Sequence, residues 1–215
     1  MARPARSPEE IKKYKDKIMV TALGMITKNG FENFSMRKLA AKLNITATTI
    51  YNYYSSKDEI YLYILIMGFD HLYEDLMDAH ESHFDVDEKI RAFIKAYIDF
   101  GIKNANYYEL MFVRDVPKYN DYVGCKEEKV AQAQLDAALR NVSAWELVYN
   151  DLAASYSVLK PSDKWFHLAK IWAGAHGIVS LYNSKVLNYL IEPTTEMMDH
   201  YVEQMVSLLF ISFDT

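Results

Sequence analysis

The sequence predicts an all-α protein with a small N-terminal domain and a larger C-terminal helical bundle. Only 7 Gly and 5 Pro interrupt its 215 residues, whereas residues that favour helices are abundant. Hydrophobic residues make up 51% of the chain, which is enough to build a core. Long helices joined by short connections fit this composition better than many strands and turns.

The cysteine content and the N-terminus favour a cytoplasmic protein. Cys125 is the only cysteine, so no intrachain disulfide can form, and the start MARPARSPEE is charged where a signal peptide would be apolar. The longest apolar run, from Ile60 to Phe69, is about half of the ~20 residues that a membrane span requires. We therefore expect a buried helix there and no membrane partner.

Charge divides the chain into two parts of opposite sign. Residues 1–57 contain 11 Lys and Arg against 4 Asp and Glu, a net charge of +7, whereas residues 58–215 contain 13 against 25, a net charge of −12. This asymmetry indicates a basic module that faces nucleic acid, attached to an acidic body that phosphate repels. The alternative is a basic face that is merely solvated.

The first helix is predicted from about Pro8 to Lys28. Ser7 is a suitable N-cap, Pro8 suits the first helical position, and Asn29 with Gly30 ends the helix. The expected buried stripe, with spacings of three and four, is Ile11, Tyr14, Ile18, Ala22 and Met25.

Residues 34–60 have the pattern of a helix-turn-helix. Ser35 can cap a short helix, Asn44 can adopt the left-handed conformation of a tight turn, and Thr46 can cap a second helix, over about 47–54. The residues expected on the inner faces are Met36, Leu39, Ala40, Leu43, Ile45 and Ile50. Two short helices that cross at a small residue are typical of this DNA-binding motif.

The same segment, FSMRKLAAKLNITATTIYNYYSSKDEI, resembles the signature of the TetR/AcrR family, and the similarity covers about residues 10–65. Its most specific parts are R-K-L-A before the turn, Thr49-Ile50-Tyr51, and Lys57-Asp58-Glu59-Ile60. Asn44 and Thr48 depart from the family, which often has Gly at both positions. Asn tolerates the same backbone, whereas Thr48 bears on base preference.

The resemblance implies a TetR-type transcriptional regulator rather than an enzyme. Such a protein is expected to be a repressor that binds a palindromic double-stranded operator as a homodimer and is released by a small effector, with no cofactor. The residues expected to contact DNA are Arg37, Thr46, Ala47, Thr48, Thr49, Tyr51, Asn52, Tyr53 and Lys57.

Roles within this set also follow from the resemblance. Arg37 and Thr49 are expected near bases or phosphates, Tyr51 and Tyr53 on the backbone, and Lys57 at a helix N-terminus that holds a phosphate. The alternative is that the tyrosines are half-buried packing residues and that Lys57 is a solvated charge.

The rest of the chain, residues 57–215, is predicted to form the effector-binding and dimerisation domain behind a DNA-binding domain of residues 1–56. Helices are expected near 57–82, 87–104, 106–114, 121–157, 162–190 and 194–212. The 121–157 stretch is long for one helix, and Ser143-Ala-Trp-Glu146 has the pattern of a capping box. If this stretch is interrupted, we expect the break or kink near Asn141.

The last two helices are expected to form the dimer interface. Ala169, Ala173 and Gly177 recur every four residues and permit close helix approach. A broad apolar stripe follows, consisting of Met198, Tyr201, Val202, Met205, Leu208 and Leu209, with Met197 and Ile211 beside it. This width exceeds what one buried face needs. The alternative is a bundle that buries the whole stripe within one chain.

Aromatic and methionine residues in the middle of the chain are expected to line a pocket for an apolar or aromatic effector. They are Tyr63, Met67, Tyr97, Phe100, Tyr108, Met111, Phe112, Trp145, Tyr149, Trp172 and His176. Taken one at a time, each is more often ordinary core. Trp172, His176 and Gly177 also form W-x-x-x-H-G, which resembles the C-terminal domain of one TetR subgroup.

Metal and enzyme functions are the competing class. His80 and His83 lie near Glu81, Asp85 and Asp87, but exposed helix-end residues explain them better than a cation site. The sequence has no phosphate-cradling glycine loop, no H-E-x-x-H and no glycine-framed nucleophile, so we assign no catalytic and no metal residues. An all-α enzyme remains the alternative.

Overall fold

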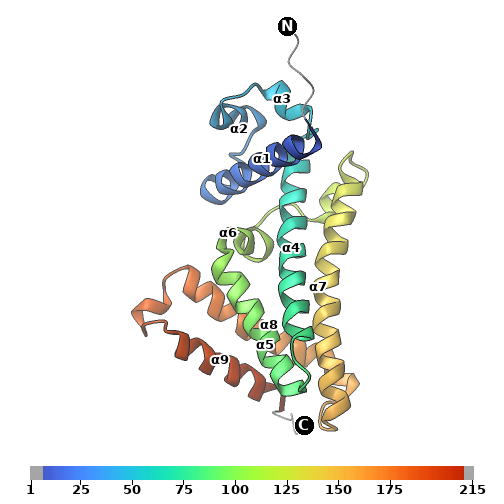
Figure 1. The fold of residues 1–215 in the computed structure, drawn as a ribbon, viewed down its shortest axis with the longest axis vertical. Coiled ribbons are helices and arrows are strands. Elements are labelled where there is room, and N and C mark those ends of the chain that lie inside the picture. Colours follow the sequence, from blue (N-terminus) through green and yellow to red (C-terminus); the bar gives the residue numbers. More distant parts are fainter. Residues whose placement is uncertain (1–6, 211–215) are drawn as a thin grey trace. The chain divides into compact units, whose positions relative to one another are not determined.

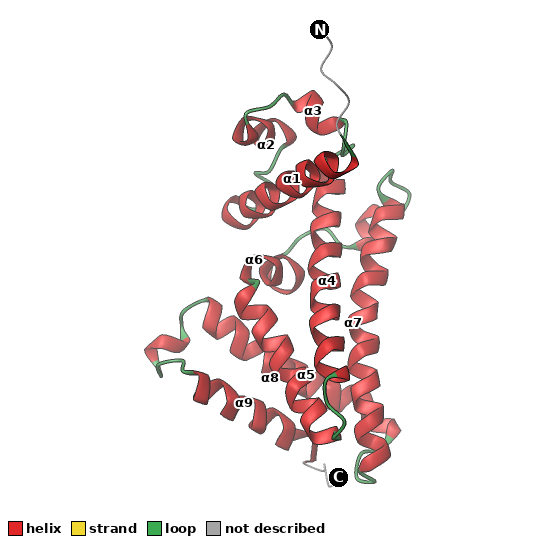
Figure 2. Ribbon diagram, viewed as in Figure 1, coloured by secondary structure: helices red, strands yellow, loops and turns green. Residues whose placement is uncertain are grey.

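The structure, a computed structural model, describes residues 7–210, and every regular element in that range is helical (Figures 1 and 2). The α-helices are α1 (Pro8–Asn29), α2 (Met36–Leu43), α3 (Ala47–Tyr51), α4 (Lys57–Glu81), α5 (Val86–Lys103), α6 (Ala105–Tyr108), α7 (Glu128–Ser155), α8 (Lys164–Asn183) and α9 (Thr195–Ser207). The predicted all-α class is therefore confirmed.

The contacts between residues divide the chain into two units. Unit 1 combines the described part of residues 1–68 with Asn106–Asp136, and unit 2 combines Phe69–Ala105 with the described part of residues 137–215. Helices α4 and α7 each contribute to both units. These two units differ from the two functional domains predicted from the sequence, residues 1–56 and 57–215. The functional division stays a prediction.

In unit 1 the predicted caps are present. Ser7 and Glu10 form a capping box at the start of α1, and the side chains of Ser35 and Thr46 accept backbone N–H groups of α2 and α3. Asn44 has φ 55° and ψ 45°, the left-handed conformation predicted for the turn. These local interactions fix where the first three helices begin and end.

The buried face of α1 is turned relative to the predicted stripe. Ile18 and Ala22 are buried as expected, but Ile11, Tyr14 and Met25 are only half-buried. Met19, Leu23 and Ile26 are buried in their place. The stripe was wrong in part because α1 contacts more than one neighbour and buries more than one row of residues.

The second helix of the motif is shorter than predicted. Helix α3 ends at Tyr51, and the amides of Tyr53 and Tyr54 close a turn on the carbonyl of Ile50, at 2.8 and 3.0 Å. Ile50 and Tyr54 are both buried, as the inward orientation predicted. The loss of the last helical turn leaves Asn52 exposed on the connection to α4.

The predicted helix over 106–114 is a short α-helix followed by a π-helical turn, η1 (Glu109–Val113). This segment packs closely on α4 because Gly68 has no side chain there. A Cβ atom at Gly68 would lie 2.6 Å from Sδ of Met111 and 3.0 Å from Cδ1 of Tyr107.

Helix α7 is continuous, so the break expected near Asn141 was wrong. The buried side-chain NH2 group of Asn141 donates to the carbonyls of Phe69 (2.9 Å) and Ala137 (3.0 Å) without interrupting the helix. Ser143 is not a cap either, since its hydroxyl donates to the carbonyl of Leu139. The hydrogen bonds from Asn141 to Phe69 and from Arg140 to Asp70 join this part of α7 to α4.

In unit 2, α8 and α9 pack on α5 and on each other. Helix α8 ends at Asn183, earlier than predicted, and a short 3₁₀ turn, Leu187–Tyr189, precedes α9. After α9, a second 3₁₀ turn ends at Phe210, so Ile211 and the predicted end at 212 lie outside the described residues. Among the described helices, none combines the length and apolarity that crossing a bilayer requires.

Candidate nucleic-acid interface

Helices α2 and α3 form the helix-turn-helix that the sequence predicts. Leu39 and Ala40 of α2 are buried together with Ile50 of α3, and α2 also packs against α1. The small side chain of Ala40 lies where the turn begins, since its carbonyl accepts the amide of Ile45 at 3.0 Å. The two helices therefore form one rigid unit that presents α3 to solvent.

Most residues predicted to contact DNA are accessible. The exposed members are Arg37, Thr46, Thr48, Tyr51 and Asn52, and the half-buried members are Ala47, Thr49, Tyr53 and Lys57. The ring of Tyr51 is exposed at the C-terminal end of α3, where a phosphate or base edge could reach it. The accessible group thus lies on and next to α3.

Four members of this set also make contacts within the protein. The hydroxyls of Thr46 and Thr49 are 2.9 Å apart, and the ring of Tyr53 lies 5.4 Å from that of Tyr14 between centroids. The ammonium of Lys57 lies 4.2 Å from the centre of the Phe31 ring, a cation–π contact. These contacts hold the side chains in place before any partner binds.

The N-terminus of α4 is fixed by residues far along the chain. Ser56 accepts the amide of Glu59 at 3.0 Å and donates its hydroxyl to the buried carboxylate of Glu127 at 2.5 Å. The hydroxyl of Tyr122 donates to Asp58 at 3.2 Å. Burial, followed by the charge of Asp58, raises the pKa of Tyr122, so its hydroxyl keeps its proton and stays a donor.

The C-terminus of α1 is also fixed by a residue far along the chain. The guanidinium of Arg114 donates to the free carbonyl of Thr27 at 2.7 Å and to the carboxylate of Glu109 at 2.8 Å. A helix end offers unpaired carbonyls, so a cation there is favourable. Sequence reasoning missed Arg114, Tyr122 and Glu127, because no local pattern pairs them with helix ends more than sixty residues away.

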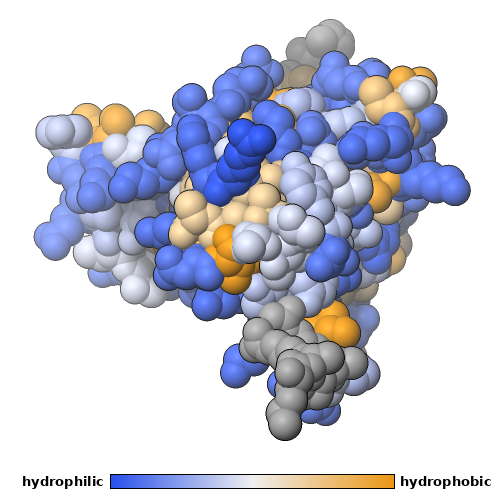
Figure 3. All heavy atoms as spheres, turned by 90° about the horizontal axis from the view of Figure 1, so that it is seen from above, coloured by the Kyte–Doolittle hydropathy of each residue, from blue (hydrophilic) through white to orange (hydrophobic). Residues whose placement is uncertain are grey.

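Seen from above, the molecule presents a mainly hydrophilic surface around a smaller apolar patch (Figure 3). Exposed lysines of α1 and α2, such as Lys13, Lys17, Lys38 and Lys42, contribute to it. They are four of the 11 Lys and Arg that give residues 1–57 a net charge of +7. A basic, hydrophilic surface around an exposed helix suits a phosphate backbone.

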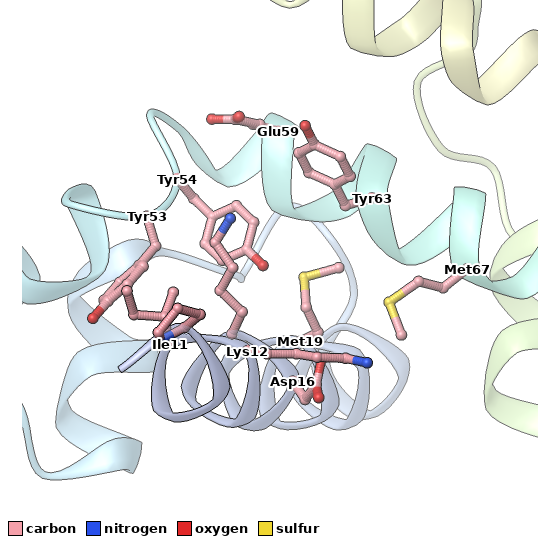
Figure 4. A pocket seen from close by; sticks show the side chains of 11 residues that line it. Ile11, Lys12, Asp16, Met19, Tyr53, Tyr54, Glu59, Tyr63 and Met67 are labelled. Atoms are coloured by element: carbon pink, nitrogen blue, oxygen red, sulfur yellow. The ribbon is translucent and has the colours of Figure 1, made fainter. Parts of the chain in front are cut away.

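The residues predicted to line an effector pocket are spread over both units. In unit 1, Tyr63 and Met67 line a hollow between α1 and α4, which we call the α1–α4 hollow (Figure 4). Tyr108 and Met111 are buried beside α4, and the ring of Phe112 lies 5.1 Å from that of Tyr108.

The remaining members belong to unit 2. The ring of Trp145 meets that of Tyr97 edge-on at 5.8 Å, and Trp172 donates its indole N–H to the Tyr97 hydroxyl at 2.8 Å. Phe100 and Tyr149 are buried, and the Tyr149 hydroxyl donates to the carbonyl of Lys160 at 3.0 Å. His176 is half-buried, 5.9 Å from Trp172 between ring centroids. These side chains pack against one another as a core does.

The residues predicted for dimerisation divide into two groups. Ala169 and Ala173 are exposed on α8, and a Cβ at Gly177 would meet no atom within 4 Å. Tyr201, Met205 and Leu208 of the C-terminal segment are half-buried. Met205 packs inside the chain, since its Sδ would lie 2.2 Å from a Cβ at Gly174.

The two histidines considered for a cation have other partners. Nε2 of His80 lies 2.8 Å from the carboxylate of Asp151, which also pairs with Lys89 at 3.3 Å. Nδ1 of His83 lies 2.9 Å from the hydroxyl of Ser82 at the end of α4. Between residues 7 and 210, no three His, Cys, Asp or Glu side chains are grouped to hold a metal ion.

Comparison with known protein families identifies the family to which this helix-turn-helix protein belongs. Residues 18–64 match the model for bacterial regulatory proteins of the tetR family, and residues 90–207, more than half of the chain, match the tetracyclin repressor-like C-terminal domain. This chain belongs to the TetR family. TetR regulators are DNA-binding transcription factors rather than enzymes, which agrees with the helix-turn-helix of α2 and α3.

Two relatives, an activator and a negative regulator of transcription, have opposite roles. The transcriptional activator FasR of Mycolicibacterium smegmatis is 24% identical over 134 residues, which cover 62% of this chain and 58% of FasR. IcaR of Staphylococcus epidermidis, a negative regulator of the biofilm operon icaADBC, is 24% identical over 85 residues, which cover 40% of this chain and 46% of IcaR. The matched segments thus span about half the length of these two proteins.

Solved structures show the same TetR fold. A tetR-family regulator from Rhodococcus RHA1 has a TM-score of 0.69 at 13% identity and covers 93% of this chain and 98% of its own. The fatty acid degradation regulator FadR of Bacillus halodurans has a TM-score of 0.66 at 12% identity, with coverages of 98% and 99%. At these identities the likeness shows the fold alone.

Proposed function

We propose that this TetR-family regulator is a repressor that binds a palindromic operator as a homodimer and releases it when a small apolar or aromatic effector binds. Two copies of α3 would enter successive major grooves, with Arg37 and Thr49 near bases or phosphates and Tyr51 and Tyr53 on the backbone. The observation that supports this best is the exposed α3 on a basic helix-turn-helix, held rigid by its caps.

The proposal of a homodimer rests on α8. One side of this helix is buried, with Ile171, Ala175 and Val179 in the core. The other side also carries large apolar residues, with Trp165 57% and Phe166 54% exposed near its start. A helix that is apolar on both sides needs a second cover, and an equivalent α8 in a second copy would supply one.

The proposal of effector control rests on α4, which begins at the DNA-binding module and continues into unit 2. A ligand that preferred one arrangement of α4 would change the spacing of the two α3 helices, whereas a ligand without such a preference would change nothing. The W-x-x-x-H-G subgroup and a cytoplasmic location belong to this proposal, because the resemblance and the composition favour them.

Selection of bound fragments from random double-stranded DNA by the purified protein tests the DNA-binding part. We expect a pseudo-palindrome whose half-sites lie about one helical turn apart. Recovery of fragments without a shared motif, or a Kd that does not depend on salt, would contradict operator binding.

Transcription of a reporter placed behind the selected operator separates repression from activation. We expect addition of the protein to lower transcript levels, and an increase would make it an activator, as the name of FasR describes. An effector should restore transcription and change the fluorescence of Trp145 or Trp172 over one concentration range, after correction for linkage. A compound that changes fluorescence without affecting operator affinity would not be the effector.

A further inference from the structure

We propose that the α1–α4 hollow is a binding site for an amphiphilic carboxylic acid, separate from the aromatic core of unit 2. The hollow has a volume of about 490 Å³ and lies wholly within unit 1, between α1, the turn after α3 and the first part of α4 (Figure 4). This volume is in the range of small-molecule sites in proteins.

The walls of the hollow suit an apolar chain or ring. Met19 of α1 and Met67 of α4 point into the space between the two helices, and Ile11 lines it nearer the start of α1 (Figure 4). Methionine side chains are flexible and polarisable, so they can adjust to ligands of different shape. The apolar part of a ligand would therefore lie between the two helices.

Tyr54 supplies a hydrogen-bond donor at one end of the hollow. Its side chain is only 6% exposed, and its hydroxyl makes no hydrogen bond to any residue between 7 and 210. Burial, and then the nearby Tyr63, Asp16 and Glu59, raises the pKa of Tyr54 to about 12. The hydroxyl thus keeps its proton, and it can donate to an acceptor placed in the hollow that Tyr54 lines.

A lysine cation lies close to Tyr54. The ammonium of Lys15 lies 5.7 Å from the centre of the Tyr54 ring, and Lys12 also lines the hollow. The lining also contains the carboxylates of Asp16 and Glu59, and Glu59 accepts the backbone N–H of Ser55 at 2.5 Å. The Lys15 ammonium and the Tyr54 hydroxyl can together bind one carboxylate head group.

Titration of the full-length protein with decanoate tests the site, with decanol and decyltrimethylammonium as probes of the same chain length but different charge. The ¹³C-methyl signals of methionine report on the walls, and substitution of Met19 or Met67 by Leu assigns them. We expect decanoate to shift these two signals with a Kd below about 1 mM, and the other two probes to bind at least about tenfold more weakly. The titration uses no DNA, so its result is independent of the proposed regulatory role.

Variants then identify the head-group contacts. We expect Lys15→Gln and Tyr54→Phe each to raise the Kd for decanoate about three- to thirtyfold, because each removes one polar contact. Lys13→Gln, an exposed lysine of α1 outside the hollow, is the matched control and should leave the Kd unchanged. The proposal is overturned if decanoate shifts other methionine signals only, if it fails to bind, or if the cation binds as tightly.

Discussion

The hydroxyl of Ser56 donates a 2.5 Å hydrogen bond to the carboxylate of Glu127, which lies 71 positions further along the chain. Ser56 also caps α4, so one side chain joins the helix start to the segment before α7. We expect Ser56→Ala to lower the free energy of unfolding by about 1–2 kcal/mol. Urea unfolding of a double-mutant cycle with Glu127→Gln should give a coupling of about 1 kcal/mol or more.

Ser55→Ala is the control for this cycle, because the side chain of Ser55 is exposed and only its backbone N–H is hydrogen-bonded. Additive effects of Ser56→Ala and Glu127→Gln would show that the hydrogen bond contributes little to stability.

A second prediction concerns Lys57, whose ammonium is held over the Phe31 ring. If this cation contacts an operator phosphate, Lys57→Ala should weaken binding to all sequences and lower the salt slope by about one unit. Binding measured at several salt concentrations gives both quantities. Lys160→Ala, an exposed charge in unit 2, should change neither. Wild-type salt dependence in folded Lys57→Ala would assign the lysine to packing on Phe31 alone.

The exposed face of α8 yields a third prediction. Ala173 is exposed in the single chain, so Ala173→Glu should leave the fold intact and produce monomers, because an interface would bury the new charge. Light scattering at micromolar concentration measures the mass, and circular dichroism checks the helices. Ala133→Glu on α7 is the matched exposed control. A dimer that tolerates Glu at position 173 would place the interface elsewhere.

Met205→Glu should behave differently from Ala173→Glu, because Met205 packs on Gly174 within the chain. We expect loss of cooperative thermal unfolding rather than a folded monomer. A folded Met205→Glu protein would mean that α9 can move away from α8.

Gly68 and Gly24 both lie within helices, so substitution of each by Ala gives a matched comparison of stability. A Cβ at Gly68 would clash with Met111, whereas one at Gly24 would meet no atom within 4 Å. Gly68→Ala should therefore cost about 1–3 kcal/mol through overpacking. Gly24→Ala should add about 0.5–1 kcal/mol through helix propensity. Chemical denaturation measures both, and equal effects would contradict the close approach of α4 and η1.

The last prediction concerns pH. His167 is buried beside the Tyr149 ring, and burial, with a smaller contribution from Lys170, lowers its pKa from the ordinary 6.5. Protons therefore bind more readily to the unfolded chain, so stability should fall as pH drops below about 6.5. His176, whose pKa burial also lowers, should act in the same direction.

Urea unfolding at about pH 7.5 and pH 5.5 measures this loss of stability. His167→Gln should show a smaller loss between the two values than the natural protein. The exposed His200→Gln should keep the full loss. The same pH dependence in His167→Gln would assign the effect to other groups.

The helix-turn-helix could be predicted from the sequence because its determinants are local. Ser7, Ser35 and Thr46 cap the helix that follows each of them, and Asn44 needs only its own left-handed backbone to make the turn. Each of these interactions spans four residues or fewer, so the pattern in the chain already contains both partners.

The tertiary structure decided which residues share a site. The aromatic residues predicted as one lining separate into Tyr63 and Met67 at the α1–α4 hollow and the Tyr97–Trp145 pair in the core of unit 2. Helical periodicity shows that a residue is apolar and on a given face, but not which helix covers that face.

Tertiary contacts likewise decided that α7 is continuous and that the N-terminus of α4 is fixed. The side-chain NH2 group of Asn141 donates to the carbonyl of Phe69, 72 positions away, and the hydroxyl of Ser56 donates to Glu127. Local sequence therefore determined where helices start and what the first module is. Long-range partners for buried polar groups determined how the helices run and pack, because such groups need a hydrogen bond that only the folded chain supplies.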